Sequence, residues 1–189
     1  ATAVSGTLLS DLPTSLDSAV RFDGVDDYIE VPHSSSLNPL NELTLEAWVK
    51  LDDASWNQKI VGKTPIGSGY LLGVADNHLY SEIWDTNGTN HALIAGNISS
   101  KQWTHLAITW RSGDKMIGYV NGVPVKSIPT SVNAISANTD ALRIGTSPWL
   151  NGYYAMGMVK DVRLYKRTLS AAEIRAEMHQ RLPGSEPGI

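Results

Sequence analysis

Residues 20–32, VRFDGVDDYIEVP, combine an acidic glycine turn with the beginning of an alternating strand. The three carboxylates of Asp23, Asp26 and Asp27 surround Gly24. Asp beside Gly is typical of a turn in which the carboxylate accepts hydrogen bonds from its own backbone. Carboxylates gathered in a loop also suit Ca²⁺, which binds carboxylate and backbone oxygens. From these residues alone the hydrogen-bonded turn is the favoured interpretation, and a cation site is the alternative.

The composition describes a single globular domain without a basic surface. The chain has 189 residues, of which 42% are hydrophobic and 18% are charged, so a core can be buried. The net charge of −4 argues against nucleic acid or an anionic membrane as the main partner. No apolar run is long enough for membrane insertion. The absence of cysteine excludes zinc fingers, thiol catalysis and disulfide scaffolds.

Short strands separated by Gly, Pro and Asn turns make up most of the chain. The clearest is 43–50, LTLEAWVK, in which every second residue from Leu43 is apolar. Further strands are expected at 59–63, 69–74, 77–84, 102–110, 115–120, 123–125, 141–145 and 158–165. The dipeptide Asn121-Gly122 predicts a tight hairpin, and Pro124 belongs on an edge strand or at the start of a strand.

One short helix is expected near the C-terminus. Ser170 and Glu173 form a capping box, and Pro183-Gly184 ends the helix. Many short strands with one helix predict an all-β fold, a two-sheet antiparallel β-sandwich of jelly-roll type. The expected divisions are a lead-in strand or linker at 1–18, one domain at 19–182 and a flexible tail at 183–189.

Seven segments of the sequence occur in the same order in a known family. They are Phe22-Asp23-Gly24 with Asp27-Tyr28, then 43–49, 102–107, 119–122, 142–145, 161–165 and 169–174. On these segments the chain resembles the laminin G-like jelly-roll modules of the concanavalin A-like lectin/glucanase superfamily, from about Ala19 to Glu177. The resemblance implies the concanavalin A-like sandwich but leaves the activity open, because one fold hosts many functions.

The resemblance also implies a structural Ca²⁺ near the acidic turn. Its ligands would be Asp23 and Asp27, with Asp161 on a late strand as a third contributor. Asp26 stands where the family commonly tolerates Gly, so it ranks lower. Many relatives carry a second acid where this chain has Lys160, which could instead pair with a nearby carboxylate.

The sequence offers no carboxylate pair for glycan hydrolysis. A retaining glycosidase needs two carboxyl groups about 5–5.5 Å apart. Glu82 and Asp85 are three positions apart, so on a strand they point to opposite faces. Glu46 stands alone on its strand, and His105 lies within another, where a packed, hydrogen-bonded imidazole is expected. We therefore expect no enzymatic activity.

Two loops place a Trp among polar side chains, a combination that suits sugar rings because the ring stacks and the polar groups hydrogen-bond. The candidate ligand-binding residues are Trp84, Asp85, Asn87 and Asn90 in one loop and Trp149, Asn151 and Tyr154 in the other. Trp56 is a third candidate, whereas Trp48, Trp103 and Trp110 lie in strong strands and are expected to pack. A Trp at a strand end can equally cover the edge of a sandwich.

The leading prediction is a non-catalytic carbohydrate-binding or adhesion module, stabilised by Ca²⁺ and monomeric as an isolated domain. Its partner would be a glycan or polysaccharide, and it would belong to a larger secreted or cell-surface protein. The first alternative is a protein-binding or structural spacer module. The second is a glycan-active enzyme of the same superfamily.

Overall fold

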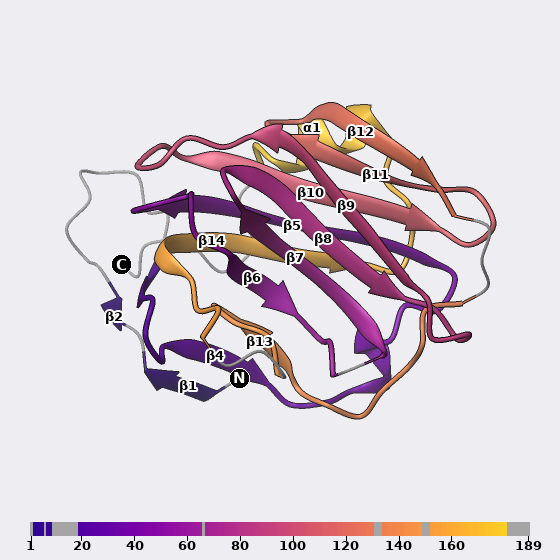
Figure 1. The fold of residues 1–189 in the computed structure, drawn as a ribbon, viewed down its shortest axis with the longest axis horizontal. Helices are drawn as coiled ribbons and strands as arrows, with labels where there is room; N and C mark the ends of the chain where they lie inside the picture. The colour runs from indigo at the N-terminus through magenta and orange to yellow at the C-terminus, as the bar shows by residue number, and fades with distance from the viewer. Residues whose placement is uncertain are drawn as a thin grey trace.

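Two seven-stranded antiparallel sheets pack face to face (Figure 1). The computed structural model describes residues 2–5, 7–8, 19–65, 67–130, 134–148 and 152–180. The first sheet has the order β1 (Thr2–Ser5), β4 (Tyr28–Val31), β13 (Leu142–Ile144), β6 (Gln58–Gly62), β7 (Gly69–Ala75), β8 (His78–Trp84) and β9 (Asn90–Asn97). The second has the order β12 (Val123–Pro129), β11 (Lys115–Val120), β10 (Thr104–Arg111), β5 (Glu42–Leu51), β14 (Met156–Tyr165), β3 (Val20–Asp23) and β2 (Thr7–Leu8). The predicted all-β sandwich is therefore confirmed.

Inward-facing side chains of both sheets fill the space between them. From β5 they are Leu43, Leu45, Ala47, Val49 and Leu51, and from β7 they are Tyr70, Leu72 and Val74. Each fully buried large apolar side chain contributes about 1.5–3 kcal/mol relative to an exposed one. This burial is the main force that holds the two sheets together.

Most strands match the sequence expectation, and β9 is the exception, because the sequence predicted no strand there. Its sequence, NHALIAGN, lacks clean alternation and contains Ala and Gly, which are depleted in strands. The predicted hairpin joins β11 to β12, with Asn121 and Gly122 at φ 50° and 72°, as a tight hairpin of this type requires. Pro124 lies on β12, which is an edge strand as predicted.

Helix α1 (Ala171–Glu177) covers part of the outer face of the second sheet, and a single 3-10 turn, η1 (Ser35–Leu37), precedes β5. The predicted capping box is present, because the Glu173 backbone N–H donates to the Ser170 hydroxyl and the Ser170 backbone N–H donates to the Glu173 carboxylate. Ile174 is the buried residue of the helix and packs with Ala107 and Tyr119. The predicted tail at 183–189 lies outside the described residues.

Polar side chains on the outer face of the second sheet hold the end of α1. Arg163 donates to Glu46 Oε1 at 3.2 Å and to the carbonyl oxygen of Glu177 at 2.9 Å. Trp48 Nε1 donates to the carbonyl oxygen of Met178 at 3.0 Å. Burial raises the pKa of Glu46, although the hydrogen bond from Arg163 acts in the opposite direction. The helix end is thus fixed by a buried ion pair and by an indole.

His105 lies beside this ion pair and is packed as predicted. Its ring meets the Trp48 indole edge to face, with the centroids 5.4 Å apart. Neither ring nitrogen has a hydrogen-bond partner among the described residues, so the predicted hydrogen bond is absent, and Nε2 lies 3.7 Å from Glu46 Oε2. Burial lowers the pKa of His105 to about 4, so the imidazole is neutral at pH 7.

We expect Arg163→Met to lower the free energy of unfolding by about 3 kcal/mol or more, because it leaves a buried carboxylate without its partner. Urea denaturation at pH 7 measures the change. The double variant Glu46→Gln with Arg163→Met should recover part of the loss, since no buried charge then remains unpaired.

Arg167→Met is the matched control, because Arg167 pairs with Glu173 in an exposed position. Its loss should stay below about 1 kcal/mol. Equal losses for Arg163→Met and Arg167→Met would show that the buried pair contributes no more than a surface pair.

Candidate functional site

The outer face of the first sheet carries a row of aromatic side chains on β8. Every second residue of this strand is buried, and the alternate residues Tyr80, Glu82 and Trp84 are half-buried and point outward. These three, with Lys59 of β6 and Tyr153 of the segment before β14, form what we call the aromatic face.

Strand β7 presents glycine beside this row. Gly69 pairs with Trp84, so no side chain of β7 stands directly opposite the indole. Gly73 pairs with Tyr80 on one side and with Lys59 on the other, which leaves room for the lysine side chain to cross the strand. The register of three strands therefore brings Lys59 and Tyr80 together.

Lys59 ends between two aromatic rings. Its Nζ lies 4.0 Å from the ring centroid of Tyr80 and 5.5 Å from that of Tyr153. Tyr153 is held in place because its carbonyl oxygen accepts a hydrogen bond from the Lys59 backbone N–H at 2.9 Å. Lys59 is only 2% exposed, and burial lowers its pKa to about 8, although the Glu82 carboxylate acts to raise it. Lys59, Tyr80 and Tyr153 are not among the ligand residues that the sequence predicts.

Asp85 shapes the loop that follows Trp84. Its buried carboxylate accepts hydrogen bonds from the backbone N–H groups of Asn87 at 2.7 Å and Thr89 at 3.0 Å, and from His91 Nε2 at 2.8 Å. Burial acts to raise the pKa of Asp85, but these hydrogen bonds outweigh it and lower the pKa. Asp85 is one of the predicted ligand residues, and here its carboxylate accepts hydrogen bonds from the loop backbone and from His91 of β9.

The remaining sequence-predicted ligand residues are dispersed around this loop and the segment before β14. Asn90 pairs directly with Trp84 across β8 and β9, so these two lie side by side. Asn87 is exposed at the loop and Tyr154 is half-buried. Trp149 and Asn151 lie outside the described residues. The third Trp candidate, Trp56, is 66% exposed in the loop before β6.

The acidic turn joins β3 to β4 and has the hydrogen-bonded form expected of its sequence. The Asp23 carboxylate accepts from the backbone N–H of Val25 at 2.8 Å and of Asp26 at 3.4 Å. The Asp27 carboxylate accepts from the Asp23 backbone N–H at 3.1 Å. Gly24 has φ 83°, the left-handed region that glycine adopts at no steric cost.

The three carboxylates of the acidic turn fit a hard cation. Asp23, Asp26 and Asp27 each offer an oxygen atom, and these oxygens lie within 4.8 Å of one another. Ca²⁺ binds oxygen at about 2.3–2.6 Å, so one ion could contact all three. The set differs from the sequence expectation, because Asp26 joins it and Asp161 does not.

Asp161 lies at a β-bulge of β14, away from the acidic turn. Met156, at the start of β14, is the residue that pairs with Asp23. The register of β14 against β5 shifts between Lys160 and Arg163, and Asp161 has φ 51°. Lys160 Nζ lies over the Trp103 ring, 5.0 Å from its centroid.

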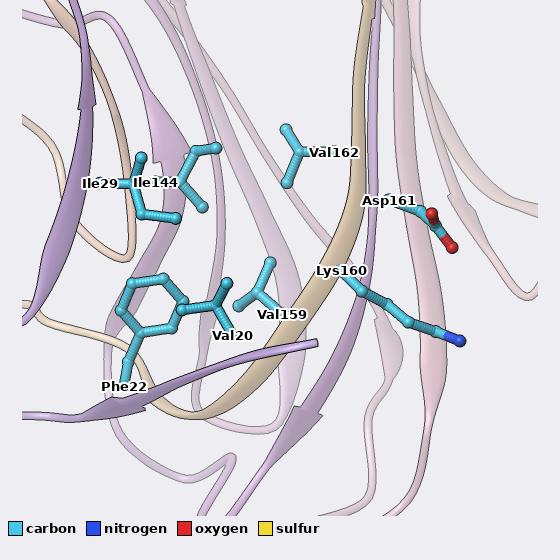
Figure 2. A pocket seen from close by; sticks show the side chains of 8 residues that line it. All are labelled: Val20, Phe22, Ile29, Ile144, Val159, Lys160, Asp161 and Val162. Atoms are coloured by element: carbon cyan, nitrogen blue, oxygen red, sulfur yellow. The ribbon is translucent and has the colours of Figure 1, made fainter. Parts of the chain in front are cut away.

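An apolar pocket of about 200 Å³ opens between the sheets beside this bulge (Figure 2). Its apolar lining comes from Val20, Phe22, Ile29, Ile144, Val159 and Val162. Figure 2 shows that the side chains of Lys160 and Asp161 point away from it. Because no charged side chain of the lining enters the pocket, its walls are mainly apolar.

Residues 23–175 match the Laminin_G_3 model of the concanavalin A-like lectin/glucanase superfamily, so the chain belongs to this family. The predicted family resemblance is therefore confirmed. No curated protein sequence is significantly similar to the chain. No helix in the described ranges is long and apolar enough to cross a membrane.

The fold is similar to that of several toxin binding domains. The binding domain of Paraclostridial Mosquitocidal Protein 1 has a TM-score of 0.75 at 18% identity, over 93% of this chain and 46% of that one. The botulinum neurotoxin serotype G binding domain has a TM-score of 0.74 at 14% identity, over 93% of this chain and 45% of that one. The botulinum neurotoxin serotype D ligand-binding domain, in complex with N-acetylneuraminic acid, has a TM-score of 0.71 at 15% identity, over 94% of this chain and 46% of that one. The chain spans less than half the length of each of these domains, and at such identities the likeness establishes the fold alone.

We expect Asp85→Ala to lower the free energy of unfolding by about 2 kcal/mol or more, because it removes the shared acceptor of three hydrogen bonds in a buried place. Chemical denaturation measures the loss. Asn87→Ala is the matched control, since it leaves the backbone N–H in place and should change stability by no more than about 0.5 kcal/mol. An Asp85→Ala variant as stable as the unaltered protein would mean that the carboxylate does not hold the loop.

Proposed function

We propose that the protein is a carbohydrate-binding module and that the aromatic face is its sugar-binding surface. The observation that carries the proposal is the grouping of Tyr80 and Trp84 with the polar Glu82 and Asn90 on one outward sheet face. Aromatic rings stack on the apolar faces of sugars, while polar groups beside them bind hydroxyls and fix orientation. We expect the module to act outside the cell as part of a larger protein.

Two further observations support a binding role over a catalytic one. Glu82 points outward from β8, whereas the Asp85 carboxylate is buried, so the two do not form the pair that glycosidases use. The similar folds of the toxin neighbours belong to domains described as binding domains, one of them with a bound sugar acid. This support is by analogy of fold.

A structural Ca²⁺ on the acidic turn is the second part of the proposal. Asp23, Asp26 and Asp27 bring three negative charges within 4.8 Å, and a bound cation would offset their mutual repulsion. The ion would also fix the connection between β3 and β4. Its role would be stability, since Asp23 ends β3 and Asp26 and Asp27 lie in the turn before β4, outside the strands of the aromatic face.

Protein binding is the second candidate function, because apolar side chains are exposed where the edge strands of the two sheets meet. Ile94 of β9 is 49% exposed, and Val123 and Val125 of β12 are 53% and 38% exposed. Lys126 Nζ donates to the Ile94 carbonyl oxygen at 3.2 Å and joins these edges. Exposed apolar side chains gathered in one place often mark an interface.

Trp84→Ala and Tyr80→Ala should each weaken glycan binding by about tenfold or more, because each removes a stacking ring from the surface. A glycan-array screen followed by titration calorimetry on the strongest sugar measures the loss. Thermal melting confirms that each variant is folded.

Trp103→Ala is the matched control, because Trp103 is also half-buried but lies beside Lys160, directly before β10 of the second sheet. Its glycan binding should be unchanged. A folded protein that binds no sugar on the array would remove the carbohydrate proposal and leave the exposed edge of β9 and β12 as the surface to test for a protein partner.

Ca²⁺ should raise the melting temperature, and EDTA should reverse the effect. At about 100 times its Kd, a ligand of the folded state adds about 2.7 kcal/mol, which corresponds to roughly 5–10 °C for a chain of this size. Asp27→Asn should abolish the response, since it removes one charge from the acidic turn.

Asp161→Asn is the control for the cation experiment, because Asp161 lies at the bulge of β14 outside the cluster of carboxylates. This variant should respond to Ca²⁺ as fully as the unaltered protein. Identical melting curves in Ca²⁺ and EDTA would contradict the metal proposal.

A further inference from the structure

We propose that the aromatic face selects glycans that carry a carboxylate group and that Lys59 is the residue that recognises this group. The inference rests on the proposed sugar-binding function and names the ligand class for the same surface. The ammonium group of Lys59 has different surroundings from those of Lys63 and Lys126.

Lys59 brings a positive charge to the aromatic face without an acceptor beside it. Among the described residues no oxygen accepts a hydrogen bond from its Nζ, and no carboxylate lies within ion-pair distance. The nearest groups are the ring faces of Tyr80 and Tyr153, with centroids 4.0 Å and 5.5 Å away. An ammonium group has three donors, and none of them meets an acceptor among the described residues.

Lys63 and Lys126, in contrast, each donate hydrogen bonds from their ammonium groups to oxygen acceptors. The Nζ of Lys63, which is buried like Lys59, donates to the Asn138 carbonyl oxygen at 3.0 Å and to Asn138 Oδ1 at 2.6 Å. The Nζ of Lys126 donates to a backbone carbonyl oxygen at 3.2 Å. Lys59 differs from both, because aromatic rings take the place of the acceptor.

The charge on Lys59 creates a preference among ligands. The ring faces attract the ammonium and offset part of its desolvation, but they do not complete its hydrogen bonds. A ligand carboxylate that reaches Nζ between Tyr80 and Tyr153 would accept a charge-assisted hydrogen bond and supply a counter-charge. A sugar hydroxyl can supply the hydrogen bond alone, so a neutral glycan gains less.

The ionisable groups around Lys59 affect both its charge and the binding of a ligand anion. They are Tyr80 and Glu82 of β8 and Tyr153 of the segment before β14. Strand β7 contributes only Gly73 at this position, which has no ionisable side chain. Glu82 is the one carboxylate among them, and it favours the charged lysine while repelling a ligand anion. Replacing Glu82 with Gln should therefore strengthen the binding of an acidic glycan.

The test compares acidic and neutral sugars that share one backbone. The probes are sialyllactose against lactose, and an oligogalacturonate against its methyl ester, titrated by calorimetry at pH 7. We expect the acidic member to bind about tenfold more tightly or better, as a hydrogen bond to a charged group allows. Lys59→Met should abolish the preference, Glu82→Gln should increase it, and Lys126→Met is the surface control that should leave it unchanged.

A pH series on the unaltered protein provides a second arm that needs no folded Lys59 variant. The pKa of Lys59, lowered by burial to about 8, means that its charge is present below this pH and is lost above it. The preference for the acidic probe should therefore fall between about pH 7 and pH 9, while binding of the neutral probe stays level. The bound carboxylate would move the midpoint to higher pH.

The outcomes separate this inference from the function on which it rests. Binding of both members of each pair with equal affinity would overturn the selection of acidic glycans and leave the sugar-binding function standing. A preference that survives Lys59→Met, or that does not fall with pH, would overturn the role of Lys59. A folded protein that binds none of the probes and no sugar on the array would overturn both proposals.

Discussion

Strand β5 is covered on both faces, and this constraint decides how the two layers of the protein differ. Its inward residues, such as Leu45, pack against the first sheet, while outward residues hold the end of α1, through Glu46 paired with Arg163 and through the Trp48 indole. Because successive side chains of a strand point to opposite faces, alternate residues of β5 pack inward and hold the helix end outward. The second sheet is therefore committed to packing on both sides at β5. The outward residues of β8 in the first sheet remain half-exposed and can meet a ligand.

Features that depend on neighbouring residues were predictable from the sequence. The capping box at Ser170, the hairpin at Asn121-Gly122 and the turn around Asp23 all form through contacts between residues a few positions apart. Such contacts follow from residue type and spacing. The adjacency of Trp84 and Asn90 belongs to the same class, because a short loop joins their strands.

Features that depend on strand register were not predictable. Lys59 reaches Tyr80 only because β7 places Gly73 between them, and its strand also shifts register after this residue. Tyr153 belongs to a segment that is distant in the sequence, and one backbone hydrogen bond holds it beside Lys59. In the same way Asp161 fits the family motif for a cation ligand, yet the pairing of Met156 with Asp23 leaves it further along β14. Nothing in a single sequence fixes these long-range pairings.

One short segment, 153–156, links the aromatic face to the acidic turn. At one end the Tyr153 carbonyl oxygen accepts from the Lys59 backbone, and at the other Met156 pairs with Asp23. The Met156 backbone N–H also donates to Gln58 Oε1 at 2.7 Å, so both ends of the segment are bound to β6. Contacts at the turn therefore restrain the position of Tyr153. The packing of this segment gives the two sites a common support, because a short segment held at both ends has little freedom to move at either.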